Sequence, residues 1–205
     1  MDKIHVQKGV ENGVCMSEKL SEKEKKYLLG LARKAITEHL KNGRTIDVKP
    51  AELPSEKLIE NGACFVTLKI NDELRGCIGT LEAHRPLVMD VIDNAINSAF
   101  SDPRFYPLNH SELEKIKISI SVLTKPKPLP ISGPDDLLNK LVPHKHGLIL
   151  KQGYARATFL PVVWEQLPDK KEFLEHLSMK AGLAKDGWKS PATSFEVYEA
   201  VEFTE

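Results

Sequence analysis

Residues 73–80 read ELRGCIGT, and this stretch decides how the first half of the chain folds. We predict a β-strand here, the return arm of a hairpin whose first strand is ACFVTLKI at 63–70, with a turn at 71–72. Strands usually avoid glycine because it has no side chain to pack. Gly76 and Gly79 therefore indicate places where a ligand or another backbone comes close.

The spacing within this strand suggests a candidate site. Because side chains alternate between two faces, Arg75, Cys77 and Gly79 are expected on one face, with Gly76 on the other. A guanidinium near a thiol favours the thiolate, which is the nucleophilic form. Two interpretations stay open: a reactive Cys77 in a shallow cleft, or a small packed cysteine in a crowded corner or bulge. Gly76 is expected to lie directly beneath another element.

Charged residues near this strand extend the candidate site. The stretch TLEAHRPL supplies Glu82 and His84, which are suited to acid–base chemistry beside a thiol. In SDPRFYPL, Arg104 is a candidate anion-binding residue that Asp102 would orient. The same residues also fit simpler roles: charged loops aid solubility, and an Asp before proline with an arginine after a helix is ordinary turn chemistry.

Helices are predicted on both sides of this hairpin. Ser21 and Glu24 form a capping-box pattern, and Gly43 marks the end of a long helix. A second apolar helix is predicted over 86–100, and a further capping box is expected in SELEKIK, from Ser111 and Glu114. The alternating stretch IKISISVL predicts a strand.

The second half repeats the order of hairpin, proline-marked corner and helix. GLILKQG and YARATFLP predict the hairpin, DKKEFLEHLSMKAG the helix, and SFEVYEAVEF one closing strand. When the halves are laid over each other, Arg75 aligns with Arg156 and Cys77 with Thr158. If the halves are quasi-symmetric, the two arginines would bracket an anion. The proline-rich stretch at 124–134 is the expected divide.

Composition narrows the classes of function. The chain has 205 residues with 29 basic and 29 acidic side chains, so it has no overall basic field for nucleic acid. No apolar run reaches the roughly 18 residues of a membrane span.

Residues 1–20 show no apolar secretory core and are expected to form an arm outside the domain at 21–205. Three cysteines without a CxxC pair favour reduced thiols and a cytoplasmic location, and no metal site is predicted.

The chain resembles the AMMECR domain family. The motifs that carry the resemblance are LRGCIG, DPRF, SVL, GLIL, FLPVVWEQLP and FLEHLSMKAGL. The last two are most similar to prokaryotic members known as the A protein of the AmmeMemoRadiSam system. The resemblance implies an α+β fold with two similar β/α halves around one mainly antiparallel, barrel-like sheet. It also adds weight to Arg75, Cys77, Asp102 and Arg104 as a site.

Two functions remain open at this level. In the first, the protein is a component of a system with a Memo-like protein and a radical S-adenosylmethionine enzyme, as the resemblance implies. In the second, it is an enzyme that uses the Cys77 thiolate, with Arg75, on a small anionic substrate or a partner. Glu82 or His84 would then move protons, while Gly79, Asp102, Arg104 and Arg156 would bind the ligand. The sequence does not identify a cofactor.

Overall fold

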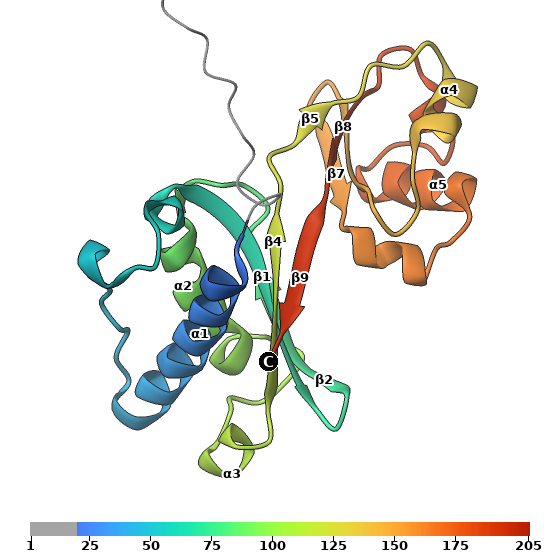
Figure 1. Cartoon of the computed structure of the whole chain (residues 1–205). Coiled ribbons are helices and arrows are strands. Elements are labelled where there is room, and N and C mark those ends of the chain that lie inside the picture. The colour runs from blue at the N-terminus through green and yellow to red at the C-terminus, as the bar shows by residue number, and fades with distance from the viewer. Residues whose placement is uncertain (1–19) are drawn as a thin grey trace, which may run out of the picture.

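The computed structural model describes residues 20–205, as an α+β fold built on two antiparallel sheets (Figure 1). The arm expected at 1–20 lies outside the described residues, apart from Leu20. The helices and strands are α1 (Glu22–Asn42), β1 (Asn61–Ile70), β2 (Glu73–Gly79), β3 (Arg85–Pro86), α2 (Leu87–Phe100), α3 (His110–Leu113), β4 (Lys117–Leu123), β5 (Lys127–Pro128), α4 (Pro134–Lys140), β6 (Gly147–Gln152), β7 (Ala155–Phe159), α5 (Lys170–Lys180), β8 (Ser194–Tyr198) and β9 (Ala200–Thr204). Short 3-10 helices occupy Pro50–Glu52, Glu56–Ile59, Pro161–Glu165 and Gly187–Lys189.

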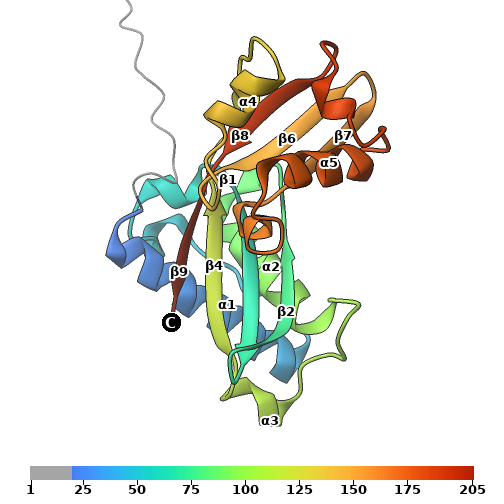
Figure 2. The same cartoon turned by 90° about the vertical axis from the view of Figure 1, so that its right-hand side faces the viewer.

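The two sheets are separate, so the expectation of one barrel-like sheet is wrong. The first sheet has the order β2-β1-β4-β9, with β3 also paired to β1, and the second has the order β5-β8-β6-β7. Figure 2 shows the second sheet above the first, with β4 and β9 running up to the junction. Among residues 20–205, no strand pairing closes the sheets into a barrel.

The closing stretch SFEVYEAVEF forms two strands rather than the single strand expected. It breaks at Glu199, where β8 leaves the second sheet and β9 enters the first. The segment that links β4 to β5 passes beside the link from β8 to β9 at this point, where the Thr124 N–H donates to the Glu199 carbonyl at 2.9 Å. The Glu199 N–H in turn donates to the Thr124 Oγ1 at 2.8 Å. Each half thus donates one strand to the other half's sheet.

The two halves share their strand order, as expected from the repeated sequence pattern. In the first sheet the hairpin β1-β2 forms one edge, and its inner strand β1 pairs with β4. In the second sheet the hairpin β6-β7 forms one edge, and its inner strand β6 pairs with β8. A strand from the other half, β9 or β5, completes each sheet. The helix in the matching connection is α2 in the first half and α5 in the second. This shared strand order agrees with the prediction that the two halves of the chain have similar folds.

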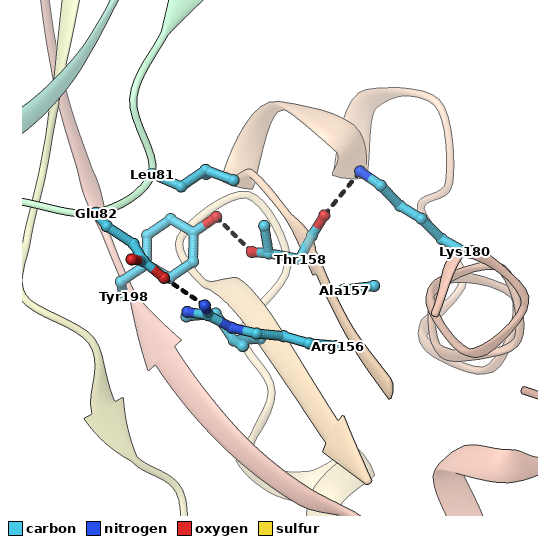
Figure 3. A pocket seen from close by; sticks show the side chains of 8 residues that line it. Leu81, Glu82, Arg156, Ala157, Thr158, Lys180 and Tyr198 are labelled. Atoms are coloured by element: carbon cyan, nitrogen blue, oxygen red, sulfur yellow. Dashed lines mark hydrogen bonds and ion pairs between the residues drawn. The ribbon is translucent and has the colours of Figure 1, made fainter. Parts of the chain in front are cut away.

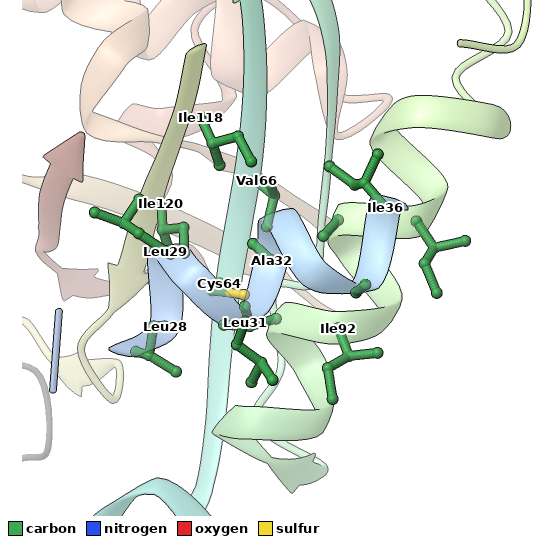
Figure 4. Close-up of a cluster of buried hydrophobic side chains, with 14 of the residues drawn as sticks. Leu28, Leu29, Leu31, Ala32, Ile36, Cys64, Val66, Ile92, Ile118 and Ile120 are labelled. Atoms are coloured by element: carbon green, nitrogen blue, oxygen red, sulfur yellow. The ribbon is translucent and has the colours of Figure 1, made fainter. Parts of the chain in front are cut away.

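The predicted first helix is confirmed together with its ends. The Glu24 N–H donates to the Ser21 hydroxyl at 3.3 Å, and the Ser21 N–H donates to the Glu24 carboxylate at 2.6 Å. Gly43 ends the helix with a left-handed φ of 65°, which glycine adopts without strain. The apolar side of α1 packs with α2 against the first sheet, burying Leu28, Ala32, Ile36 and their neighbours (Figure 4).

Two further apolar clusters hold the second half and the junction. In the core of the second half, the Trp164 ring stacks on the ring of Phe173 in α5, with centroids 3.7 Å apart. Where the two sheets meet, a smaller cluster joins Ala63 and Leu123 of the first sheet to Ile149 and Tyr198 of the second. No helix within residues 20–205 is long and apolar enough to cross a membrane.

Candidate functional site

A β-bulge interrupts the ELRGCIGT strand at Arg75. Cys77 pairs with Thr67 on β1, but the register then shifts, so that Leu74 pairs with Lys69 and Arg75 is left as the extra residue. The unbroken alternation expected from Arg75 to Cys77 is therefore wrong, and the two side chains contact different partners. The Cys77 Sγ accepts a hydrogen bond from the Thr67 hydroxyl at 3.2 Å.

Arg75 anchors the segment that follows α2. Its Nε and Nη2 donate to the two carboxylate oxygens of Glu112 at 2.7 and 3.0 Å, and its Nη2 also donates to the Tyr106 carbonyl at 2.9 Å. The hydrogen bond from Arg75 lowers the pKa of Glu112. Glu112 also closes the capping box of α3, whose N-cap is Asn109. The box expected from Ser111 and Glu114 is wrong, since α3 begins earlier than predicted.

Asp102 and Arg104 bond the outer edge of β2, which confirms that they lie beside the Cys77 strand. The Cys77 N–H donates to Asp102 Oδ2 at 2.8 Å, and Arg104 Nη2 donates to the Cys77 carbonyl at 3.2 Å. Arg104 also donates to Asp102 through its Nε at 2.9 Å and its Nη2 at 2.7 Å. These bonds hold the pKa of the buried Asp102 well below its usual range. The pair thus satisfies the backbone of an edge strand, which would otherwise be free to join another chain.

The two glycines of the motif both serve packing. A Cβ built on Gly76 would lie 2.0 Å from the Ser98 backbone oxygen of α2, which confirms that another element rests directly on this backbone. A Cβ on Gly79 would lie 2.2 Å from the Phe65 ring and 2.6 Å from the Cys64 carbonyl oxygen. The expectation of an open cleft face at Gly79 is therefore wrong, because the Phe65 ring fills that space.

The predicted acid–base residues contact partners other than the thiol. His84 Nδ1 contacts the backbone oxygen of Glu82 at 2.8 Å, and the Glu82 carboxylate pairs with Arg156 of the second sheet. Among residues 20–205, no acidic or basic side chain hydrogen-bonds to the Cys77 Sγ. The other described cysteine, Cys64, is fully buried, and burial raises the pKa of its thiol.

Arg75 and Arg104 lie beside two aromatic residues, of which Tyr106 is exposed. The Phe105 ring lies 5.8 Å from the Arg75 guanidinium and 5.6 Å from that of Arg104, and Tyr106 beside it is 90% exposed. An open hollow of about 340 Å³ lies among these side chains. We call the surface formed by Arg75, Arg104, Phe105, Tyr106 and Glu112 the Tyr106 platform.

A second hollow lies at the junction of the two sheets (Figure 3). Its volume is about 280 Å³, and it is lined by Leu81, Glu82, Ile149, Arg156, Ala157, Thr158, Lys180 and Tyr198. We call it the inter-sheet pocket. The sequence pointed to Glu82 and Arg156 separately but did not pair them, and it missed Lys180 and Tyr198. These come from α5 and β8, so no local pattern indicates that they meet.

The proposed match of Arg75 with Arg156 is offset by the bulge. In the second hairpin Arg156 pairs with Lys151, and the corresponding pair in the first hairpin is Leu74 with Lys69. Arg75 is the inserted residue and has no counterpart. The two arginines therefore belong to different surfaces, one to the Tyr106 platform and one to the inter-sheet pocket.

Comparison with known proteins identifies relatives over nearly the whole chain. The sequence pattern of the AMMECR1 family matches residues 29–203. Protein MK0488 of Methanopyrus kandleri is 44% identical over 194 residues, covering 93% of this chain and 92% of its own. A protein of Methanothermobacter thermautotrophicus is 40% identical over 187 residues, covering 91% and 96%. The crystal structure of the uncharacterized protein PH0010 from Pyrococcus horikoshii is similar with a TM-score of 0.79 and 34% identity, covering 91% and 93%.

Proposed function

The chain belongs to the AMMECR1 family, and from the geometry of its motif we propose that it is a binding component of a protein assembly. Its partners would be a Memo-like protein and a radical S-adenosylmethionine enzyme, one of which docks on the Tyr106 platform. The observation that carries this proposal is how the motif uses its polar groups. Arg75, Asp102 and Arg104 are bonded to the protein itself, and Arg75 also bonds the backbone carbonyl of the exposed Tyr106.

The platform has the properties of an interface anchor. Tyrosine and arginine are enriched among the residues that dominate binding energy, since they combine apolar area with hydrogen-bonding groups. Tyr106 offers a large exposed ring, and the Arg104 side chain remains 53% exposed. The Arg75 bond to the Tyr106 carbonyl fixes the backbone beneath that ring. A fixed backbone lowers the entropy lost on binding.

Thiol chemistry at Cys77 is the alternative function, and its surroundings offer it less support. A nucleophilic cysteine normally has a base or a free cation beside it. Here the Sγ contacts the Thr67 hydroxyl, while both nearby guanidinium groups are paired with carboxylates. Glu82 and His84, the acid–base candidates, have other partners. This arrangement favours a structural role for the thiol.

The experiment is a binding measurement with a matched surface control. A Memo-like protein and a radical S-adenosylmethionine enzyme would each be titrated into the wild type by calorimetry. We expect Tyr106→Ala to weaken binding by about tenfold or more, as for a central interface tyrosine. Tyr154→Ala removes an equally exposed tyrosine from the tip of the second hairpin and should leave affinity unchanged within about twofold. Failure of both partners to bind, or equal losses in both variants, would reject the proposal.

A further inference from the structure

The inter-sheet pocket has the chemistry of a site for a small anion with an apolar part. We propose that it binds a small-molecule carboxylate, whose carboxylate group takes the place of the Glu82 side chain on Arg156. The site is distinct from the Tyr106 platform and does not depend on the partner proposal. It is built almost wholly from the second half of the chain, with Leu81 and Glu82 closing it from the first.

The charges around the pocket favour an anion. Two of its lining residues, Arg156 and Lys180, are cationic, and Glu82 is the single acidic residue among them. Arg156 pairs with Glu82, but its side chain is 49% exposed. Lys180 donates one hydrogen bond to the Thr158 carbonyl at 2.9 Å, and its Nζ lies 5.0 Å from the centroid of the Phe159 ring. Within residues 20–205 its other two donors have no hydrogen-bond partner. Without Glu82, the pocket carries two positive charges and no negative one.

The floor of the pocket is neutral and partly apolar. The Tyr198 hydroxyl donates to the Phe159 carbonyl at 3.1 Å, and the Thr158 hydroxyl lies 2.9 Å from the same tyrosine oxygen. Burial raises the pKa of Tyr198 to about 12, so the phenol stays protonated and adds no charge that would repel an anion. Leu81, Ile149 and Ala157 supply apolar walls. The pocket therefore suits a ligand with one anionic group and an apolar body.

Glu82 marks where the ligand carboxylate would sit. It already places a carboxylate on the Arg156 guanidinium, the planar fork that recognises carboxylates through paired N–H groups. The Glu82 side chain is 64% exposed. Because such surface ion pairs contribute little to stability, a ligand can displace Glu82 with a small loss of free energy. Displacement would also break the ion pair between the loop after β2 and the second sheet.

The test uses phenylacetate and its neutral counterpart, phenylacetamide. Each would be titrated into the intact protein while backbone amide shifts are followed by NMR. We expect millimolar phenylacetate to shift the amides of residues 81–82, 156–158 and 198, with phenylacetamide binding at least about tenfold more weakly, because it lacks the charge-assisted bonds. Glu82→Gln frees Arg156 and should tighten phenylacetate binding roughly two- to fivefold. Arg156→Gln should weaken it by about tenfold or more.

Glu175→Gln provides the matched control. It breaks the ion pair of Lys185 with Glu175, both outside the lining of the pocket, and should leave phenylacetate affinity unchanged. The inference is overturned if millimolar phenylacetate causes no shifts at the pocket, or if the acid and the amide bind equally. Weaker binding by Glu82→Gln, or equal effects of Glu82→Gln and Glu175→Gln, would overturn it as well.

Discussion

Replacing Asp102 with alanine tests whether the DPR segment holds the edge of β2. The substitution removes the acceptor of the Cys77 N–H and exposes Arg104 without its partner. A hydrogen bond to a charged group contributes about 1.5–3 kcal/mol to the free energy of unfolding. The half-exposed Arg104 pair adds only about 0–1 kcal/mol. We therefore expect Asp102→Ala to lower the free energy of unfolding by about 1.5–4 kcal/mol.

The assay is urea unfolding followed by circular dichroism, with thermal unfolding beside it. For a chain of this size the same loss lowers the Tm by roughly 3–16 °C. Glu22→Ala removes an exposed helix carboxylate paired with Lys25 and should change stability by no more than about 0.5 kcal/mol. A loss in Asp102→Ala of less than about 1 kcal/mol would refute the reasoning, since β2 would then not need its edge bonds.

The pH dependence of this difference follows from the low pKa of Asp102 in the folded protein. A carboxyl whose pKa is depressed by folding stabilises the protein fully above its unfolded pKa of about 4, and this contribution is lost as the pH falls towards the folded value. The gap in stability between wild type and Asp102→Ala should therefore be full at pH 7 and smaller at pH 3. A gap that stays constant from pH 7 to pH 3 would contradict the assignment.

The remaining predictions concern the glycines. Gly76→Ala places a Cβ against the Ser98 backbone oxygen and should destabilise the protein by about 1–3 kcal/mol or more, measured by urea unfolding. Gly30→Ala, in α1 with no atom within 4 Å, should stabilise it by about 0.5–1 kcal/mol; equal effects at the two positions would contradict the packing account. Gly79→Ala should cost about 1–3 kcal/mol through the Phe65 ring, and an unchanged Tm would show that the ring moves freely aside.

The parts of the fold that local sequence determines were predictable. The ends of α1 follow from Ser21, Glu24 and Gly43, whose interactions lie within a few residues of each other. The first hairpin follows from the Asn71-Asp72 turn, where both residues adopt the positive φ that such turns require. The division into two sheets depends instead on which strand pairs with β5 and β9. That choice is made at the crossing near Glu199, and no neighbouring residue signals it.

The part of the candidate site that was predictable is the proximity of the LRGCIG and DPRF stretches. The proximity of Asp102 to Cys77 was expected because the two stretches occur together in the family resemblance. A bulge was one of the two open interpretations of this strand, but its position at Arg75 was not predicted, since one inserted residue leaves the letters of an alternating strand unchanged while moving a side chain to new partners. The inter-sheet pocket needs Glu82 beside Arg156, and only the packing of the two halves brings them together.

The central claim is that the motif supports a binding surface, and amide hydrogen exchange tests it most directly. Exchange would be measured for the protein alone and with a saturating amount of the Memo-like protein or the radical S-adenosylmethionine enzyme. The account predicts that one of these partners slows exchange at residues 104–106, while the hairpin tip at 153–154 exchanges as before. Unchanged exchange at 104–106 with both partners, or slowing confined to other surfaces, would contradict it.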